Sequence, residues 1–220
     1  MNRRRFLTVG STVGLSLASG CLGYSVVSTD EMESRKARID SLEQTTANLN
    51  ATLREREDRI ESLEAELSAA TNETDRLKRE RRTLIEDQLS ALYRAGSRFY
   101  TGGEESYQTG NGAANDREYT AASRAFGVAF GKFDGATEFF YRTYQLAETD
   151  GYTDGMDVSE AANEYCVAMR DACDDFSVAM RRYANGDDSE GDDLVESGNA
   201  LYEEAQNYAV RRPAHFDSQL

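Results

Sequence analysis

The chain has 220 residues, with 40 acidic and 25 basic side chains and a formal net charge of −15 at pH 7. This negative balance excludes a general nucleic-acid binder, because such a protein needs a basic footprint, so we expect no nucleic-acid partner. The length allows one domain with an extension and excludes two large domains. The charge is uneven, since residues 96–220 carry 24 of the acidic side chains against 10 basic ones.

The first 21 residues contain the three parts of an export signal. Three arginines precede the uncharged residues 6–20, and the small residues "ASG" lead directly into Cys21. The stretch "RRRFL" resembles a twin-arginine signal, and the residues that carry this resemblance are Arg3, Arg4, Phe6 and Leu7. "ASGC" resembles a lipobox, where a signal peptidase cleaves before a cysteine that receives a lipid. The resemblance implies that Cys21 is the lipid-attachment residue and that its lipid binds the chain to a membrane.

Two residues depart from these motifs. Asn2 stands where Ser or Thr usually precedes the arginine pair, and Ala18 stands where leucine is preferred. The alternative is an uncleaved anchor, because residues 6–27 are an uncharged run of 22 residues that could just span a bilayer. With cleavage, residues 1–20 are the signal peptide and residues 21–29 are a tether on the extracytoplasmic face of the cytoplasmic membrane.

Residues 30–95 have the composition and the periodicity of a coiled-coil helix. They contain no Pro or Gly, and their only aromatic residue is Tyr93. With Ile39 at position a of a heptad, ten of fourteen successive a and d positions are apolar. The ten are Ile39, Leu42, Leu49, Leu53, Ile60, Leu63, Leu67, Ala70, Leu77 and Leu84. This repeat predicts a coiled-coil stalk, and we expect its copies to associate in parallel because each is tethered at the same end.

Two alternatives to self-association are open. The first is a lone helix stabilised by ion pairs four residues apart, such as Glu55 with Arg59. The second is a hairpin that turns near residues 68–75. Four seam positions are polar and can fix the register or the number of strands. They are Thr46, Arg56, Thr74 and Arg81.

Two sequons for N-glycosylation fall in the predicted stalk. They begin at Asn50 and Asn72. A sequon is used only in an exported chain, and the N-terminal signal provides for export. Asn72 falls at the outward-facing position f of the heptad, whereas Asn50 falls at position e beside the seam.

Nineteen of the 21 Phe and Tyr residues lie after Leu92, which indicates that a core begins there. Later apolar residues recur at steps of three and four, and no segment alternates with a period of two. We therefore predict an all-α fold, in which the long coiled-coil helix is followed by an antiparallel helical bundle over residues 96–220. Residues 101–116 are rich in glycine and are expected to form a loop, at the end of which Asn115 caps the next helix.

Part of this bundle resembles a degenerate tetratricopeptide repeat. The spacing of the repeat's two helices is matched by Leu92, Ala95, Gly96 and Phe99, and by Tyr119, Ala122, Phe126 and Ala129. The resemblance implies a groove that binds a peptide or a helix of another protein. The alternative is a simple antiparallel bundle of four or five helices.

Only three of the 25 basic residues are lysine, and carboxylates must dominate the surface. This composition resembles that of proteins from salt-adapted archaea, in which hydrated carboxylates keep the surface soluble and salt screens their repulsion. The chain thus resembles an exported lipoprotein of haloarchaeal type. The alternative is an ordinary acidic protein from a GC-rich genome.

Cysteine and histidine residues offer little chemistry. Cys166 and Cys173 share a helix face about 10.5 Å apart along the axis, which is too far for a disulfide, so we expect both to be packing residues. His215 is the only histidine and lies in a polar tail, where no second ligand or catalytic partner is near it in sequence. We expect no catalytic residue and no cofactor.

The segment "NGDDSEGDDLVE", residues 185–196, is a candidate calcium-binding loop of the EF-hand type. Its ligand positions are occupied by Asn185, Asp187, Ser189, Asp193 and Glu196. Glu190 takes the position that requires glycine for the turn. The alternative interpretation is a solvated acidic loop between two helices.

These observations favour a non-enzymatic, lipid-anchored protein that presents an acidic helical domain to an unidentified protein partner at the cell envelope. The alternative is a ligand- or cation-binding envelope lipoprotein of the receptor type. An enzyme is supported only by the surplus of carboxylates, in which no spacing singles out a catalytic pair.

Overall fold

The computed structural model describes residues 28–220, and within that range every regular element is an α-helix. The elements are α1 (Thr29–Asn115), α2 (Tyr119–Asp150), α3 (Thr153–Asn185), α4 (Asp188–Ala205) and α5 (Pro213–Asp217). The predicted all-α fold is confirmed. The chain divides into two units, Met1–Ala69 and Ala70–Leu220, and α1 contributes residues to both.

The described part of the first unit is a single exposed helix. Ser28 precedes it, and the side-chain oxygen of Ser28 accepts a hydrogen bond from the backbone N–H of Glu31 at 3.3 Å. Asp30 and Glu31 occupy the first turn, where negative charge is favourable at the positive end of the helix. The residues that follow are mostly strong helix formers such as Leu, Glu, Arg and Ala, so the backbone is helical without tertiary packing along residues 29–69.

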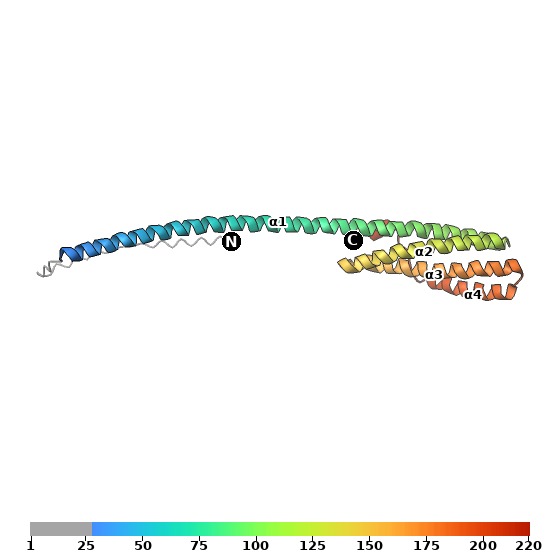
Figure 1. The fold of residues 1–220 in the computed structure, drawn as a ribbon. Coiled ribbons are helices and arrows are strands. Elements are labelled where there is room, and N and C mark those ends of the chain that lie inside the picture. Colours follow the sequence, from blue (N-terminus) through green and yellow to red (C-terminus); the bar gives the residue numbers. More distant parts are fainter. Residues whose placement is uncertain (1–27) are drawn as a thin grey trace. The chain divides into compact units, whose positions relative to one another are not determined.

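The second unit is an antiparallel bundle of the end of α1 with α2, α3 and α4 (Figure 1). The connections are only residues 116–118, 151–152 and 186–187, and such short links place consecutive helices side by side in opposite directions. Gly151 and Gly186 have φ angles of 79° and 83°, so each ends its helix in the left-handed conformation that glycine adopts without strain. The predicted antiparallel bundle is confirmed.

The tetratricopeptide alternative does not fit these helices. Such a repeat holds two helices and a turn within 34 residues. By contrast, α2 alone has 32 residues and α3 has 33, and α2 runs without a break through its glycines. The matching spacings therefore reflect the step of three and four residues that any buried helix face shows.

The predicted glycine-rich loop is wrong, because α1 continues to Asn115. Three glycines in this part of α1, at positions 96, 103 and 110, repeat every seven residues and are partnered by phenylalanines of α2. A Cβ atom would lie 2.8 Å from the ring of Phe140 at Gly96, 2.9 Å from Phe133 at Gly103 and 2.7 Å from Phe126 at Gly110. The glycines thus let three rings lie against the α1 backbone, and burying these rings offsets the roughly 1 kcal/mol that each glycine costs a helix.

The start of the bundle and the N-cap of α2 also differ from the prediction. Leu89 and Tyr93 are fully buried, so the bundle core includes residues that the heptad assigned to the stalk. Asn115 is the last residue of α1 instead of a cap for α2, whose N-cap is Glu118. The connection is therefore the three residues 116–118, and Glu118 makes no side-chain capping hydrogen bond.

The C-terminal segment packs against α1 within this unit. Phe216 of α5 is fully buried, and its ring stacks on Tyr93 with centroids 4.2 Å apart and planes 2° from parallel. The Tyr93 hydroxyl donates a hydrogen bond to the carbonyl of Arg211 at 2.8 Å. Asp217 accepts hydrogen bonds from Ser90 at 2.7 Å and from Arg94 at 2.6 Å. These contacts attach the C-terminal segment to one helix turn of α1.

Candidate functional site

The residues predicted for export and lipid attachment lie outside the described range. They are Arg3, Arg4, Phe6, Leu7 and Cys21. Among residues 28–220, no helix is both long and apolar enough to cross a bilayer. Asn50 and Asn72 lie on α1 and are exposed, so both sequons are accessible.

The candidate calcium segment does not form an EF-hand loop. Only Gly186 and Asp187 separate α3 from α4, and Ser189, Asp193 and Glu196 are helical. Their side chains cannot converge on one ion from a continuous helix, and residues 28–220 contain no group of three or more acidic, Cys or His side chains placed to hold a metal.

The acidic residues at the start of α4 stabilise the helix instead of forming a metal site. Asp188 and Glu190 lie in its first turn, where they stabilise the positive end of the helix. Glu190 also pairs with Arg182 of α3 at 3.2 Å. The solvated-loop alternative is therefore also wrong for most of the segment, because it is the beginning of a helix.

Cys166 and Cys173 are fully buried in the bundle core, as predicted for packing residues. Burial raises the pKa of the Cys166 thiol strongly and that of Cys173 to about 12. Both thiols are thus protonated at neutral pH and are not nucleophiles. His215 is exposed on α5, as expected for the tail.

Glu104 is a partly buried carboxylate of α1 that the sequence analysis did not single out. Its Oε1 accepts a hydrogen bond from the Tyr165 hydroxyl of α3 at 2.8 Å. Burial raises the pKa of Glu104, and burial together with this carboxylate raises the pKa of Tyr165. The signal was present in the sequence, since Glu104 stands four residues after Tyr100 and three before Tyr107 on the core-facing stripe. Glu104 could be recognised as a core-facing residue only if residues 101–116 were predicted to be helical.

Replacing Glu104 by glutamine should raise the melting temperature at pH 7. The folded chain has a higher Glu104 pKa than the unfolded chain, so this group stabilises the fold below its unfolded pKa and the contribution is lost as the pH rises. Glutamine still accepts from Tyr165 and carries no charge. Thermal melts across pH 3.5–7 should therefore show a gain that shrinks toward acid. Glu105→Gln, at the exposed neighbouring position, is the control and should show no such trend.

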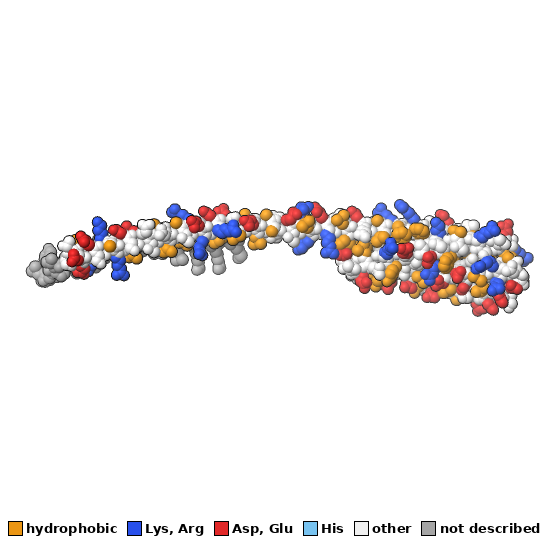
Figure 2. All heavy atoms as spheres, viewed as in Figure 1, with side chains coloured by type: hydrophobic (Ala, Val, Ile, Leu, Met, Phe, Trp, Pro, Cys, Tyr) orange, Lys and Arg blue, Asp and Glu red, His pale blue; other side chains and the backbone are white. Residues whose placement is uncertain are grey.

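The largest exposed apolar feature is the heptad seam of α1, which Figure 2 shows as hydrophobic side chains recurring among charged ones. Its side chains keep between 46% and 69% of their surface accessible. They are Ile39, Leu42, Leu49, Leu53, Ile60, Leu63, Leu67, Leu77 and Leu84. Elsewhere in the described chain, the large apolar side chains that are exposed to this degree are Met32, Val128 and Tyr141. Exposed apolar side chains that recur along one helix are typical of a surface that associates with another molecule.

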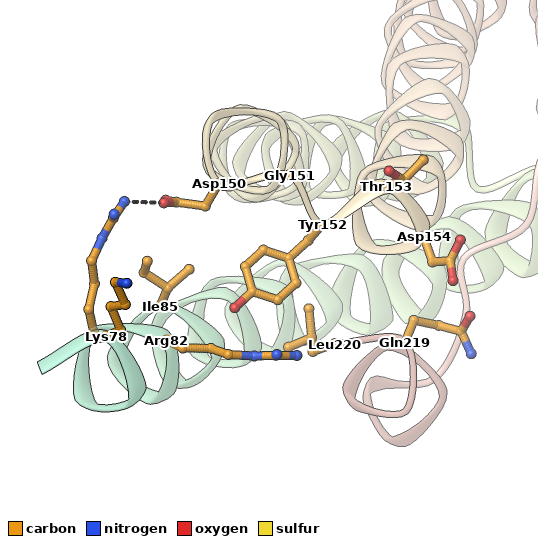
Figure 3. A pocket seen from close by; sticks show the side chains of 11 residues that line it. Lys78, Arg82, Ile85, Asp150, Gly151, Tyr152, Thr153, Asp154, Gln219 and Leu220 are labelled. Carbon is orange, nitrogen blue, oxygen red and sulfur yellow. Dashed lines mark hydrogen bonds and ion pairs between the residues drawn. The ribbon is translucent and has the colours of Figure 1, made fainter. Parts of the chain in front are cut away.

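A cleft of about 680 Å³ lies in the second unit, where the turn between α2 and α3 meets α1 (Figure 3). Two of its three cations have close partners, since Arg81 contacts Asp150 at 2.5 Å and Arg82 contacts Glu86 at 2.8 Å, whereas the third, Lys78, lies 4.0 Å from Asp75. The Tyr152 hydroxyl lies 3.4 Å from the same Glu86 carboxylate. The cleft is lined by charged side chains of both signs, since the carboxylates of Asp150 and Asp154 lie in it together with its cations.

The chain was compared with family models, curated proteins and solved structures, and none of them matches it. The functional conclusions therefore depend on the residues and their geometry.

Proposed function

We propose that this protein is a lipid-anchored, non-enzymatic envelope protein that presents an acidic helical bundle for protein–protein interaction. Cys21 carries the lipid after twin-arginine export, and residues 30–95 associate with other copies in parallel. The observation that carries the proposal is the apolar seam of α1, which stays exposed although the bundle core is closely packed. An exported chain with one exposed apolar row needs a partner for that row.

The N-terminal motif supports the anchor. A single acyl chain binds a membrane only marginally, whereas two chains on one cysteine give stable attachment. The excess of carboxylates over residues 96–220 supports function in concentrated salt, where repulsion between them is screened within a few Å. The use of charged groups supports a non-enzymatic role, because the Glu104 carboxylate and the two cleft arginines are engaged by neighbouring side chains.

The cleft favours a second candidate, a receptor-type lipoprotein that binds a small ligand between α1 and the α2–α3 turn. Calcium is not supported as that ligand, because the acidic segment is helical. A small molecule that copurifies with the wild-type protein but not with Arg82→Ala would favour the receptor function over the protein-interaction function.

The anchor is tested by replacing Cys21 with alanine in cells that express the full chain. We expect the variant to be almost absent from the lipid-modified protein of the membrane fraction, because Cys21 is the residue that carries the lipid. Cys173→Ala is the matched control and should stay in that fraction. Mass spectrometry of the wild-type protein should find a mature chain that begins at a diacylated Cys21. An intact Met1 with an unmodified Cys21 would contradict the proposal.

A further inference from the structure

We propose that residues 31–84 of α1 form a two-stranded, parallel and in-register coiled coil with a second copy of this chain. This inference rests on the self-association in the proposed function and adds the number of strands, the register and the residues that fix them. Three features of α1 carry it: the face on which the seam lies, the side chains at positions a and d, and the charges that flank them.

The seam lies on a face of α1 that the bundle leaves uncovered. Within the second unit, Leu77 and Leu84 at position d remain 51% and 68% exposed. The side chains of α1 that enter the bundle begin one residue later, with Ile85, Leu89 and Tyr93. Those residues occupy positions e, b and f of the same heptad, on other faces of the helix. A second helix can therefore pack along the seam without displacing α2 or α3.

The seam composition favours two strands. Leu stands at five of the seven d positions, and β-branched Ile or Thr stands at four of the seven a positions. Leu at d with β-branched residues at a is the pattern of parallel dimers. Arg56 at d and Arg81 at a also favour two strands, because the core of a dimer is open enough for a long charged side chain to reach water.

The flanking charges select the register. In a parallel dimer, each position g faces position e of the following heptad in the other strand. In register, four such pairs are opposite in charge and none is alike: Glu31 with Lys36, Arg38 with Glu43, Arg59 with Glu64, and Glu73 with Lys78. Symmetry doubles them to eight attractive contacts. Sliding one strand by a heptad leaves three attractive and three repulsive contacts over the same residues, so the charges favour the in-register pair.

The charge conflict at the C-terminal end of the seam is resolved within each chain. Arg81 at position a would face its own copy across the seam, and two like charges would repel. The structure places Asp150, the last residue of α2, 2.5 Å from Arg81. This carboxylate neutralises the guanidinium at the end of the coiled coil, so the last apolar layer, Leu84, can still close.

Disulfide trapping of the full-length protein in membranes tests the seam. We expect Leu49→Cys, at position d, to convert most of the chain to a covalent dimer on oxidation, because its partner lies directly opposite. Ala51→Cys, at the outward position f, should form less than a tenth as much dimer, and the wild-type chain sets the background. Equal yields from the two variants, or no dimer from Leu49→Cys, would overturn the proposal. Lipid on Cys21 is measured in the same samples, so loss of anchoring and loss of pairing are told apart.

A charge exchange tests the register. Arg38 and Glu43 are suited to it, because Glu31 and Glu73 also pair with arginines of their own helix. Arg38→Glu or Glu43→Arg alone creates two like-charge contacts per dimer and should weaken dimerisation of the detergent-solubilised full chain roughly tenfold near 0.15 M salt. The double variant restores opposite charges and should return to within about threefold of wild type. A double variant as weak as the worse single variant would overturn the in-register arrangement.

Discussion

Replacing Gly103 by leucine is expected to lower the free energy of unfolding of the bundle by about 3 kcal/mol. A Cβ atom at this position would lie 2.9 Å from the ring of Phe133, and that ring is fully buried. The leucine side chain would therefore force α1 and α2 apart or drive Phe133 out of its rotamer. Chemical denaturation followed by circular dichroism measures the loss.

The matched control is Gly112→Leu in the same helix. No atom lies within 4 Å of a Cβ at Gly112, and the position is exposed. Leucine there should stabilise the helix by about 0.5–1 kcal/mol, because glycine costs helical backbone entropy that leucine does not. If both variants changed stability by the same amount, close approach of the Phe133 ring would not be the reason for glycine at position 103.

These two glycines show why part of the fold was accessible from the sequence and part was not. The periodic stripe of Cys166, Met169, Cys173 and Phe176 predicts a buried helix face, because apolar side chains at steps of three and four identify such a face whatever they contact. Glycine has no such local signature. Gly103 and Gly112 look alike in sequence, and only the ring of Phe133, thirty residues later, distinguishes a packing position from an open one.

The candidate site shows the same division. The apolar seam between Ile39 and Leu84 could be found from the heptad alone, since the repeat lies within the sequence of one helix. The pairs Arg81 with Asp150 and Glu104 with Tyr165 each join residues more than 60 positions apart, so they depend on which helices lie side by side. The calcium interpretation was wrong for a related reason: an EF-hand pattern and the acidic first turn of α4 use the same residue types.

Replacing Phe216 by alanine is expected to cost about 3–5 kcal/mol of unfolding free energy. The side chain is fully buried and stacks on Tyr93, which in turn packs against Phe140 with centroids 5.0 Å apart. Alanine would leave a cavity beside the Tyr93 ring and would weaken the hydrogen bonds that hold Asp217 and Arg211 to α1. The short helix α5 has only five residues and cannot persist without this packing.

Two measurements separate a local effect from a global one. His215→Ala removes the exposed neighbour of Phe216 and should change stability by less than about 0.5 kcal/mol. Hydrogen exchange should then show lost protection in α5 of Phe216→Ala, followed by the turn of α1 that contains Tyr93. If Phe216→Ala matched His215→Ala in denaturation and in exchange, the C-terminal segment would not contribute to the stability of the bundle. If the loss reaches Tyr93, the segment is part of the core, because an aromatic ring from the end of the chain then holds the first turns of the bundle where α1 enters it.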